Sequence, residues 1–401
     1  MSEYDVVVAG GGPAGLQFAR EIAHRSDYSV AVLERNARLS DNDKSTGGTF
    51  HQVIEGYDIP DSVVMSANPD VIFEGPEANG RLAIPNYVLD FPAFLEYLGE
   101  DAADHGVDVL TGARVSAPLV EGGAVAGVTA RVDGKKREFR AKVTVDATGP
   151  AGVLTRPLRM WDPAAGQRGI GKEYEVEGDF DHDSMLFRFD HELVPGGYAW
   201  VFPAGENRFK IGVCWVDEFY ERHCQRTDRS IDAYIERWME SDSRWRVDEV
   251  RAVHAGEAIS DNSINRRADD GIVAVGDAVS SINPLFGEGI RPGMESAEMA
   301  ADAVLDALRA DDFSRDTLAE YEARWNREKG PKWRTQRVVG ELLYDFDADQ
   351  QNRFVRKAGD LSDEQVARLQ RYELSVPDLL SLYPFKVRDV AKVPTLVRHL
   401  T

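Results

Sequence analysis

Apolar runs and helical patterns alternate in the first part of the chain. Residues 4–9 are almost wholly apolar, the segment GGGPAG follows, and residues 16–25 place apolar side chains at helical spacing. A second apolar run, at residues 28–34, ends in Glu34. Strands that are buried in parallel sheets have such continuous runs, so we predict a strand, a glycine turn, a helix and a second strand, together a βαβ unit.

The pattern then changes twice. Residues 41–50 are polar and then glycine-rich, which predicts a loop, and the alternation around Asp133 and Gly134 predicts a β-hairpin. From 161 to 250 aromatic strands replace helical patterns, which favours a separate antiparallel sheet. An apolar run typical of a buried strand returns at residues 270–279, and Pro292 near the start of the next helical pattern is typical of a first turn.

The chain remains helical in pattern beyond Asp311. We therefore predict an α/β fold, α+β overall because of the second sheet. A Rossmann-like dinucleotide-binding domain is expected at 1–68, 87–160 and 251–310, an antiparallel β-sheet substrate domain at 69–86 and 161–250, and a C-terminal helical region at 311–401.

The glycine turn has the spacing GxGxxG at Gly10, Gly12 and Gly15. The first glycine permits a tight turn, the second lets the backbone approach a pyrophosphate, and the third lets the helix pack close to the strand. Glu34 ends the second strand, where a carboxylate accepts hydrogen bonds from an adenosine ribose. The pattern predicts dinucleotide binding, with a glycine turn in an unrelated α/β protein as the alternative.

Composition and charge narrow the function further. The chain has 401 residues, of which 43% are hydrophobic, and a formal net charge of -22. That charge argues against nucleic acid as a partner, because phosphates repel an acidic surface. Only 11 residues are Lys and 36 are Arg, which predicts a surface adapted to high salt; an ordinary acidic cytosolic protein is the alternative.

Neither the apolar runs nor the cysteines indicate a membrane span or a metal site. No apolar run approaches the ~18 to 20 residues that a spanning helix needs, and the N-terminal segment lacks the basic region and cleavage site of a signal peptide, so we expect a cytoplasmic protein. Cys214 and Cys224 have neither metal-ligand nor thioredoxin spacing and are expected to be small buried hydrophobes. We expect no metal.

Three motifs occur in an order that resembles a known flavoprotein superfamily. The N-terminal glycine turn is followed by a strand ending in DATG at 146–149 and a late strand ending in GDA at 276–278. This order resembles the superfamily that includes p-hydroxybenzoate hydroxylase. Within it the chain is similar to the geranylgeranyl reductase family over nearly all of its length, through NPLFGEGI at 283–290 with MES behind it, PGGYAWVFP at 195–203 and YEARW at 321–325.

The resemblance implies FAD as the cofactor, with Asp277 at the ribityl chain and the loop after it beside the flavin ring. Relatives often carry Cys-Gly-Gly where this chain has Thr46, Gly47 and Gly48. The expected cofactor-binding residues are Gly10, Gly12, Pro13, Ala14, Gly15, Glu34, Arg35, Thr46, Gly47, Gly48, Val115, Gly149, Asp277, Gly287, Gly289 and Ile290.

The resemblance also implies an oxidoreductase that acts on CH–CH groups and hydrogenates geranylgeranyl double bonds of archaeal-type membrane lipids or of a prenyl diphosphate. Tyr198, Trp200 and Phe202 alternate, so on a strand they share one face, and with Pro203 they are the expected substrate wall. Core packing is the alternative for these aromatics. Tyr198, Glu288 and His51 are candidate proton donors, none of them favoured over the others by the sequence.

Other activities stay open at this point. A flavin-dependent monooxygenase or halogenase, a reductase of a menaquinone prenyl side chain, and a flavin-carrying lipid-binding protein would share most of these motifs. No second GxGxxG occurs, so the reductant is expected from outside, as NAD(P)H or from an electron-donor protein such as ferredoxin. A lipid substrate implies peripheral contact with the inner membrane surface, and the resemblance together with the charge suggests a salt-adapted archaeal source.

Overall fold

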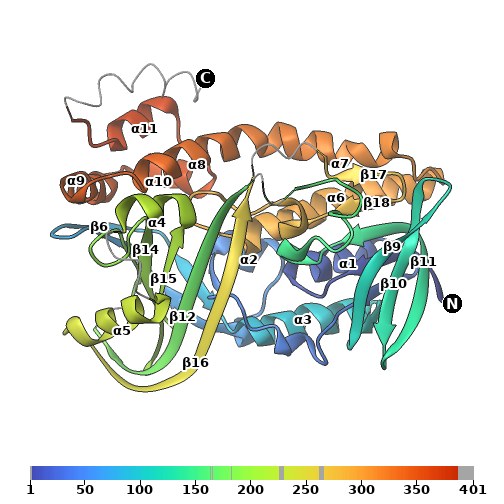
Figure 1. The fold of residues 1–401 in the computed structure, drawn as a ribbon, viewed down its shortest axis with the longest axis horizontal. Helices are drawn as coiled ribbons and strands as arrows, with labels where there is room; N and C mark the ends of the chain where they lie inside the picture. The colour runs from blue at the N-terminus through green and yellow to red at the C-terminus, as the bar shows by residue number, and fades with distance from the viewer. Residues whose placement is uncertain are drawn as a thin grey trace.

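A mixed sheet of eight strands contains the N-terminal strand and occupies the right-hand half of Figure 1. The computed structural model describes residues 2–162, 164, 166–181, 183–224, 230–261 and 266–386. The strands run in the order β17-β18-β11-β1-β2-β8, and β10 pairs with β11 and β9. Their bounds are β1 Ser2–Ala9, β2 Val30–Leu33, β8 Asp108–Leu110, β9 Ala113–Glu121, β10 Ala124–Val132, β11 Lys135–Asp146, β17 Ala268–Asp269 and β18 Ile272–Ala274.

Strand β1 lies inside this sheet, with β2 and β11 parallel to it on either side. Val6, Val7 and Val8 are fully buried, which is why the run is continuously apolar and does not alternate. Helices α1 (Pro13–Arg25), α3 (Phe91–Asp104) and α6 (Ile290–Ala310) share one hydrophobic core with this sheet, and the short α2 (His51–Gly56) contributes Val53 to it. The predicted βαβ unit is confirmed.

The predicted hairpin is present on the other side of the sheet. Strands β10 and β11 pair antiparallel from 127 to 140 around a turn in which Asp133 and Gly134 both have positive φ, 49° and 74°. Both central residues of a type I′ turn need positive φ, and Asp followed by Gly is a favoured pair there. A second core that includes Val128, Phe139 and Trp161 fills the space on this face.

A second sheet of seven strands lies in the left half of Figure 1. Its order is β16-β12-β15-β14-β13-β5-β6, and all neighbours are antiparallel except β13 and β5. The bounds are β5 Val71–Glu74, β6 Asn79–Leu82, β12 Gln167–Phe180, β13 Met185–Arg188, β14 Gly197–Pro203, β15 Arg208–Val216 and β16 Trp245–Ser260. Strand β16 thus stays in this sheet beyond residue 250, where we placed the boundary.

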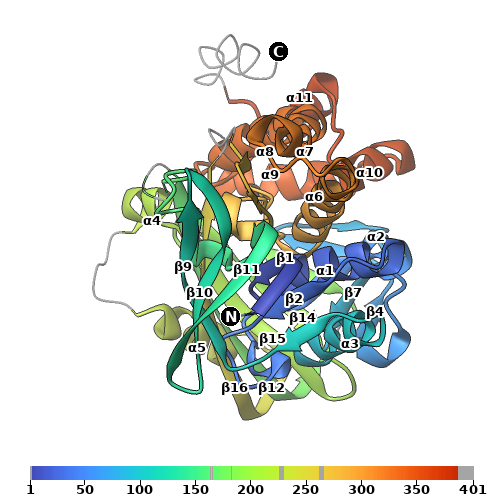
Figure 2. The same ribbon diagram turned by 90° about the vertical axis from the view of Figure 1, so that its right-hand side faces the viewer.

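Helices cover the two faces of the seven-stranded sheet differently. Helix α5 (Ile231–Ser241) packs on one face through Trp238, and α4 (Asp217–His223) follows β15. Near the opposite face lie helices from the C-terminal part of the chain, which run along the top of Figures 1 and 2. These are α8 Gly330–Leu343, α9 Ala348–Gly359, α10 Asp363–Gln370 and α11 Val376–Leu382, whereas α7 Arg315–Glu328 packs on α6 and on β17 and β18 of the eight-stranded sheet. A small sheet, β3 Gly48–Phe50, β7 Asn86–Leu89 and β4 Val64–Asn68, borders both halves.

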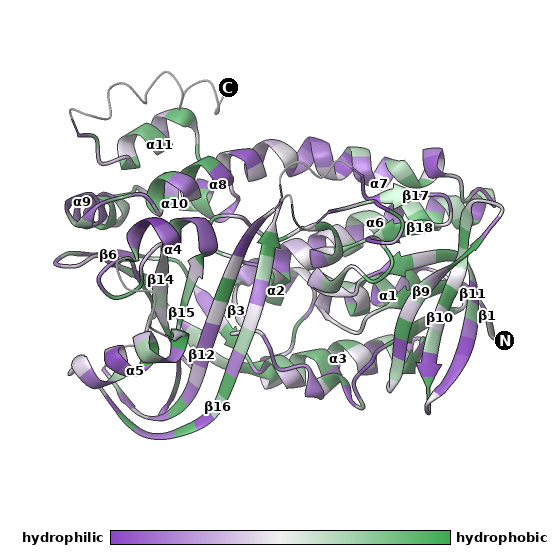
Figure 3. Ribbon diagram, in the orientation of Figure 1, coloured by the Kyte–Doolittle hydropathy of each residue, from purple (hydrophilic) through white to green (hydrophobic). Residues whose placement is uncertain are grey.

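Polar residues predominate on helix α7. In α7 only Leu318, Tyr321 and Trp325 are buried, and Figure 3 shows hydrophilic residues over much of the rest of this helix. Within the described ranges, no helix combines the length and the apolar character that crossing a membrane requires. The predicted helical C-terminal region is therefore an amphipathic layer over the rest of the fold.

Asp146, at the end of β11, organises the loop that follows it. The residue is fully buried, and its carboxylate accepts hydrogen bonds from the backbone N–H groups of Thr148, Leu154 and Thr155 at 3.0, 2.9 and 2.8 Å. The Thr148 hydroxyl adds a fourth at 2.6 Å. One carboxylate therefore holds the short helix η3 (Gly149–Ala151) and the turn behind it against the sheet.

We predict that Asp146→Ala lowers the free energy of unfolding by about 3 kcal/mol, because three buried N–H groups lose a charged acceptor. Urea unfolding followed by far-UV circular dichroism measures the change. The matched control is Asp104→Ala at the exposed C-terminal end of α3, which should stay within about 0.5 kcal/mol of the parent protein. Equal losses in both variants would contradict the assigned role of Asp146.

Candidate active site

A cavity of about 1040 Å³ is lined by residues of both sheets. One part of its wall comes from the glycine turn after β1, the ends of β2 and β11, and the segment from Val275 to Arg291. The other part comes from one face of the seven-stranded sheet, through side chains of β12, β14 and β15. Segments that are more than 250 residues apart in sequence, such as Gly12 and Gly287, therefore border one space. The volume is at the upper end of the range of about 300–1,000 Å³ for ligand pockets.

The glycine turn leaves bare backbone at the cavity wall. Gly10 has a φ of +111°, and a Cβ placed on it would lie 2.3 Å from the carbonyl oxygen of Ala147. A Cβ on Gly15 would lie 2.1 Å from the carbonyl oxygen of Gly10. No described atom lies within 4 Å of a Cβ on Gly12, which lines the cavity as the N-cap of α1. Gly10 and Gly15 thus allow the turn and α1 to pack closely against the neighbouring backbone, and Gly12 leaves free volume for a ligand.

Glu34 is buried at the end of β2 and lines the same part of the cavity. Its Oε2 accepts a hydrogen bond from the N–H of Gly11 at 2.9 Å, and its Oε1 accepts one from the N–H of Asn36 at 2.8 Å. These bonds fix the carboxylate. Because an ionised carboxylate can accept about four hydrogen bonds, it retains capacity for hydroxyl donors of a ligand.

Asp277 also lines the cavity, in the short helix η5 (Gly276–Val279), whose first residue lies close to Ala14 of α1. Burial raises the pKa of its carboxyl group to about 6, and no ion pair with a described residue offsets that burial. The preceding N–H, of Gly276, donates to the hydroxyl of Ser296 at 2.9 Å, and that hydroxyl donates to the carbonyl of Gly293 at 2.7 Å. The serine of the MES motif therefore holds η5 against the first turn of α6.

Glu288 is held by three hydrogen bonds in the loop after Asp277. Arg291 binds both of its carboxylate oxygens, at 2.9 and 3.1 Å, and the Tyr372 hydroxyl donates to Oε2 at 2.5 Å. Arg291 is 3% exposed, donates to the carbonyl oxygen of Gln370 at 2.8 Å and lies 4.1 Å from the ring centroid of Tyr372. The carboxylate of Glu288 thus ties the loop to the segment after α10.

Three aromatic side chains of β14 form one wall of the cavity. Tyr198, Trp200 and Phe202 are buried and all line the space, as the alternation predicts for one face of a strand. The Phe202 ring lies close to Gly48, where a Cβ would be 2.9 Å from its Cε2 atom. Phe187, on β13, meets the Phe202 ring edge-on at a centroid separation of 5.2 Å. This part of the cavity is apolar and aromatic.

The Tyr198 hydroxyl bridges the wall and the loop. It donates a hydrogen bond of 2.7 Å to the carbonyl oxygen of Phe286, and burial raises the pKa of Tyr198 well above its usual value. Its neighbour across the strands, Cys214, is a free and partly buried thiol whose pKa burial raises to about 12. Neither group is suited to release a proton at neutral pH.

The remaining predicted residues divide into two groups. In addition to those described above, the cavity is lined by Pro13, Ala14, Arg35, Thr46, Gly48, Val115, Gly149, Gly287, Gly289 and Ile290. His51, Gly15, Gly47 and Pro203 are not among its lining residues. A Cβ on Gly47 would lie 2.4 Å from the carbonyl oxygen of Leu89, so this glycine allows close packing of the loop. Cys214 and Cys224 are only partly buried, whereas we expected buried ones.

Several polar residues in the cavity wall were not predicted, and Glu173 and His254 are two of them. Glu173 on β12 and His254 on β16 both line the cavity, and the Trp200 indole N–H donates to Glu173 Oε2 at 2.7 Å. The alternation in residues 167–180 could have placed Glu173 on the same face as other side chains. It could not have shown which residue of another strand lies opposite, because that depends on the register.

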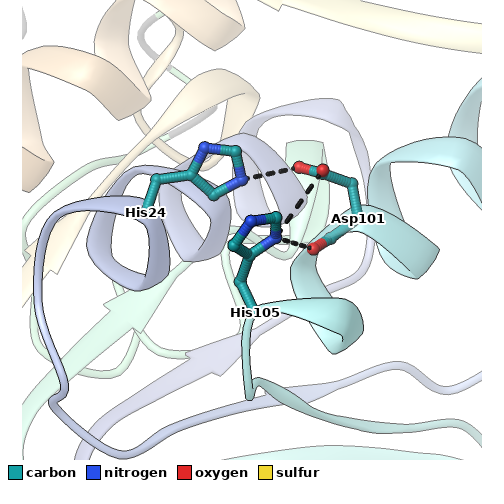
Figure 4. Close-up of side chains that lie close together, drawn as sticks. All are labelled: His24, Asp101 and His105. Atoms are coloured by element: carbon teal, nitrogen blue, oxygen red, sulfur yellow. Dashed lines mark hydrogen bonds and ion pairs between the residues drawn. The ribbon is translucent and has the colours of Figure 1, made fainter.

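A cluster of two histidines and one aspartate lies outside the cavity, between α1 and α3 (Figure 4). Asp101 accepts hydrogen bonds from Arg20 at 2.6 Å and from His24 at 2.9 Å, and His105 Nδ1 lies 3.7 Å from its other oxygen. These ligand-type atoms are close enough to share a cation, but the Arg20 guanidinium already neutralises the carboxylate. We assign the cluster to the packing of the two helices.

Comparison with known proteins identifies the family. The profile of the family described as "Lycopene cyclase protein" matches residues 5–388. A digeranylgeranylglycerophospholipid reductase of Haloferax volcanii is 36% identical over 90% of this chain and 91% of its own length. The chain therefore belongs to the geranylgeranyl reductase family. Digeranylgeranylglycerophospholipid reductase 1 of Methanopyrus kandleri is 28% identical over 90% of this chain and 96% of its own length.

Solved structures agree on the fold. A geranylgeranyl bacteriochlorophyll reductase-like protein of Thermoplasma acidophilum has a TM-score of 0.85 at 22% identity and covers 99% of this chain and 100% of its own. The flavin-dependent brominase Bmp2 has a TM-score of 0.71 at 18% identity, with 98% and 99% covered. The predicted combination of a Rossmann-like sheet and an antiparallel sheet is therefore confirmed as the fold of this family.

We predict that Asp277→Asn makes the ligand-free protein more stable at neutral pH, by up to about 3 kcal/mol. Burial raises the carboxyl pKa from 3.8 to about 6, so between these values the unfolded chain is ionised and the folded one protonated. The parent protein therefore loses stability as pH rises from about 4 to 6, and the asparagine variant loses less. Urea unfolding across this range measures both slopes, and identical slopes would contradict the burial of an unpaired carboxyl group.

Proposed function

We propose that the protein is an FAD-dependent reductase that saturates isoprenoid double bonds of archaeal-type membrane lipids or of a prenyl precursor. One observation carries the proposal: a single cavity joins a dinucleotide-type glycine turn to an apolar aromatic wall. The relationship to digeranylgeranylglycerophospholipid reductases supports the same substrate class. Such a cavity can bring a flavin and a long apolar chain together away from water.

The residues at one end of the cavity fit FAD. The open space at Gly12 and the free N–H groups at the start of α1 suit a pyrophosphate. The fixed carboxylate of Glu34 suits the hydroxyls of a ribose, and the unpaired Asp277 would be satisfied by the hydroxyls of the ribityl chain. When bound there, FAD supplies the hydride for reduction of a double bond.

The aromatic end suits a prenyl chain. Tyr198, Trp200 and Phe202 offer a continuous apolar surface beside the loop of Gly287, where a Cβ would lie 4.0 Å from the Tyr198 hydroxyl. A smaller cavity of about 60 Å³ shares Phe73, Leu285, Phe286 and Leu369 with the large one, and its other lining residues are apolar or aromatic and come from the C-terminal part of the chain. These residues orient the chain through shape and exclude water from the reacting bond.

The electrons and the lipid must both reach the site from outside the protein. We propose NAD(P)H or a donor protein such as ferredoxin as the reductant. Peripheral contact with the membrane is proposed for the segment after α10, at residues 375–385. Leu379 and Leu382 of α11 are buried, and Phe385 is 37% exposed, so this phenylalanine is the candidate contact.

The proposed activity predicts that anaerobically reduced protein-bound flavin is reoxidised when a digeranylgeranyl glycerophospholipid is added. Absorbance of the flavin follows the reaction, and mass spectrometry of the lipid counts the hydrogens gained. The saturated lipid is the control, since it offers no double bond. If no prenyl lipid reoxidises the reduced flavin, the proposal is wrong. Oxygen uptake with a hydroxylated or halogenated product would favour a monooxygenase or halogenase instead.

The proposed cofactor site predicts that Gly12→Ala weakens FAD binding at least tenfold and leaves the ligand-free protein as stable as the parent. The added methyl group would occupy the open space at the turn without touching a described atom. Fluorescence titration with FAD and thermal unfolding measure the two effects. Gly56→Ala is the matched control, because its Cβ also meets no described atom but points outside the cavity lining. Unchanged FAD affinity in Gly12→Ala would contradict the proposed pyrophosphate position.

A further inference from the structure

The aromatic face of the seven-stranded sheet contains a row of polar residues that the proposed function does not use. Glu173 on β12 is paired directly with His254 on β16 and with Gly212 on β15, and Gly212 is paired with Trp200 on β14. Paired residues of neighbouring strands project from the same face. Glu173, His254 and Trp200 therefore share the face that lines the cavity.

The missing side chain at Gly212 allows the Trp200 ring to reach Glu173. A Cβ on Gly212 would lie 2.2 Å from Cζ2 of the Trp200 ring, so the indole lies across the bare backbone of β15. In this position its N–H reaches Glu173 Oε2, two strands away, at 2.7 Å. The contact between a cavity-lining ring and a buried carboxyl group therefore requires a glycine at position 212.

The carboxyl group of Glu173 is only partly satisfied. Glu173 and Lys210 are each 2% exposed, and Lys210 Nζ lies 4.0 Å from Glu173 Oε1, too far for a hydrogen bond. Among the described residues, Oε1 has no hydrogen-bond partner, and the same holds for Nε2 of His254. Burial raises the pKa of Glu173, a change that Lys210, Trp200 and His254 oppose and Glu175 supports.

We propose that Glu173 is the general acid of the reaction and delivers the proton that alkene reduction requires. This inference rests on the proposed function. The O–H bond of the protonated Glu173 carboxyl group breaks and a C–H bond forms at one carbon as the alkene π bond opens, while the other carbon receives a hydride from reduced flavin. The products are the saturated carbon pair, oxidised flavin and a Glu173 carboxylate, which the Trp200 N–H and the Lys210 ammonium stabilise.

The other candidate acids have less suitable surroundings. The proton of Tyr198 is donated to the Phe286 carbonyl, and Glu288 is bound by Arg291 and Tyr372. His254 offers a route for returning the proton to Glu173, because its Nε2 lies 3.7 Å from Oδ2 of Asp43, whose side chain is 36% exposed. Glu173 is therefore buried in the cavity wall, and its cross-strand neighbour His254 lies near a partly exposed carboxylate.

Infrared difference spectroscopy of the lipid-free protein with its flavin tests the protonation directly. A carbonyl band of a protonated carboxyl group should be present near pH 7, shift in D₂O and vanish in Glu173→Gln. Glu175→Gln, on the same strand two residues along, is the matched control and should keep the band. Absence of a band that depends on Glu173 would overturn the proposal, whatever the protein does with lipid.

Reoxidation of the reduced flavin by prenyl lipid tests the transfer. Glu173→Gln should lower the rate about 100-fold at unchanged lipid KM and abolish its decline with rising pH, since general acids contribute about 10²–10⁴-fold. Glu173→Asp should recover part of the rate. If Glu173→Gln unfolds because Lys210 loses its partner, the double variant with Lys210→Met should refold and keep the loss.

The outcomes separate this inference from the proposed function. If the Glu173→Gln variant is as active as the parent protein and keeps its pH profile, the proposed role of Glu173 is wrong. The proposed reductase activity would not be affected by that result. A parent protein whose reduced flavin no prenyl lipid oxidises would overturn both. If the Glu173→Gln variant reoxidises its flavin slowly but keeps the pH profile of the parent protein, Glu173 only positions Trp200. This result would also overturn the proposal.

Discussion

Close packing of bare backbone at the ends of β1 and β11 determines where the cavity can form. Gly10, Gly15 and Ala147 approach so closely that a Cβ on either glycine would overlap a carbonyl oxygen. Helix α1 therefore starts directly at the sheet edge, with its free N–H groups toward the cavity. Because β18 pairs with β11, the late loop with Asp277 ends at the same edge. The glycine turn and this loop face each other for that reason.

Local patterns predicted much of this arrangement. The apolar run of β1, the Asp133–Gly134 turn, Pro292 in the first turn of α6 and the alternating aromatics of β14 each report a local requirement of backbone or burial. The family motifs then related the N-terminal turn to residue 277. Both kinds of signal can be read from a few consecutive residues, and for that reason they succeeded without knowledge of the tertiary structure.

The parts that were missed depend on register and on long-range packing. The contact of Trp200 with Glu173 exists only because β14, β15 and β12 pair with Gly212 in the middle. Glu288 was a candidate acid because the sequence does not show that its carboxylate is paired. Its partners, Arg291 and Tyr372, reach it only through the packing of α6 against a distant segment. No local pattern distinguishes a carboxylate that will be paired from one that will not.

Glu173 and Glu288, two carboxylates of the cavity wall, differ in how their charge is compensated. Glu288 has a bidentate guanidinium partner and a phenol donor, which compensate the loss of hydration. Glu173 has one indole donor and an ammonium group at 4.0 Å. An incompletely compensated carboxyl group costs folding free energy, and such sites are concentrated where proteins carry out chemistry.

The hydrogen bonds of Arg291 have a consequence for the architecture as a whole. Through the carbonyl of Gln370 and the Tyr372 hydroxyl, the loop that borders the cavity is attached to a segment about 80 residues further along the chain. The terminal helices are therefore part of the scaffold of the site and not an appendage. A chain cut before residue 370 would keep both sheets and every glycine of the turn, yet its loop would lose the anchor that holds it in place.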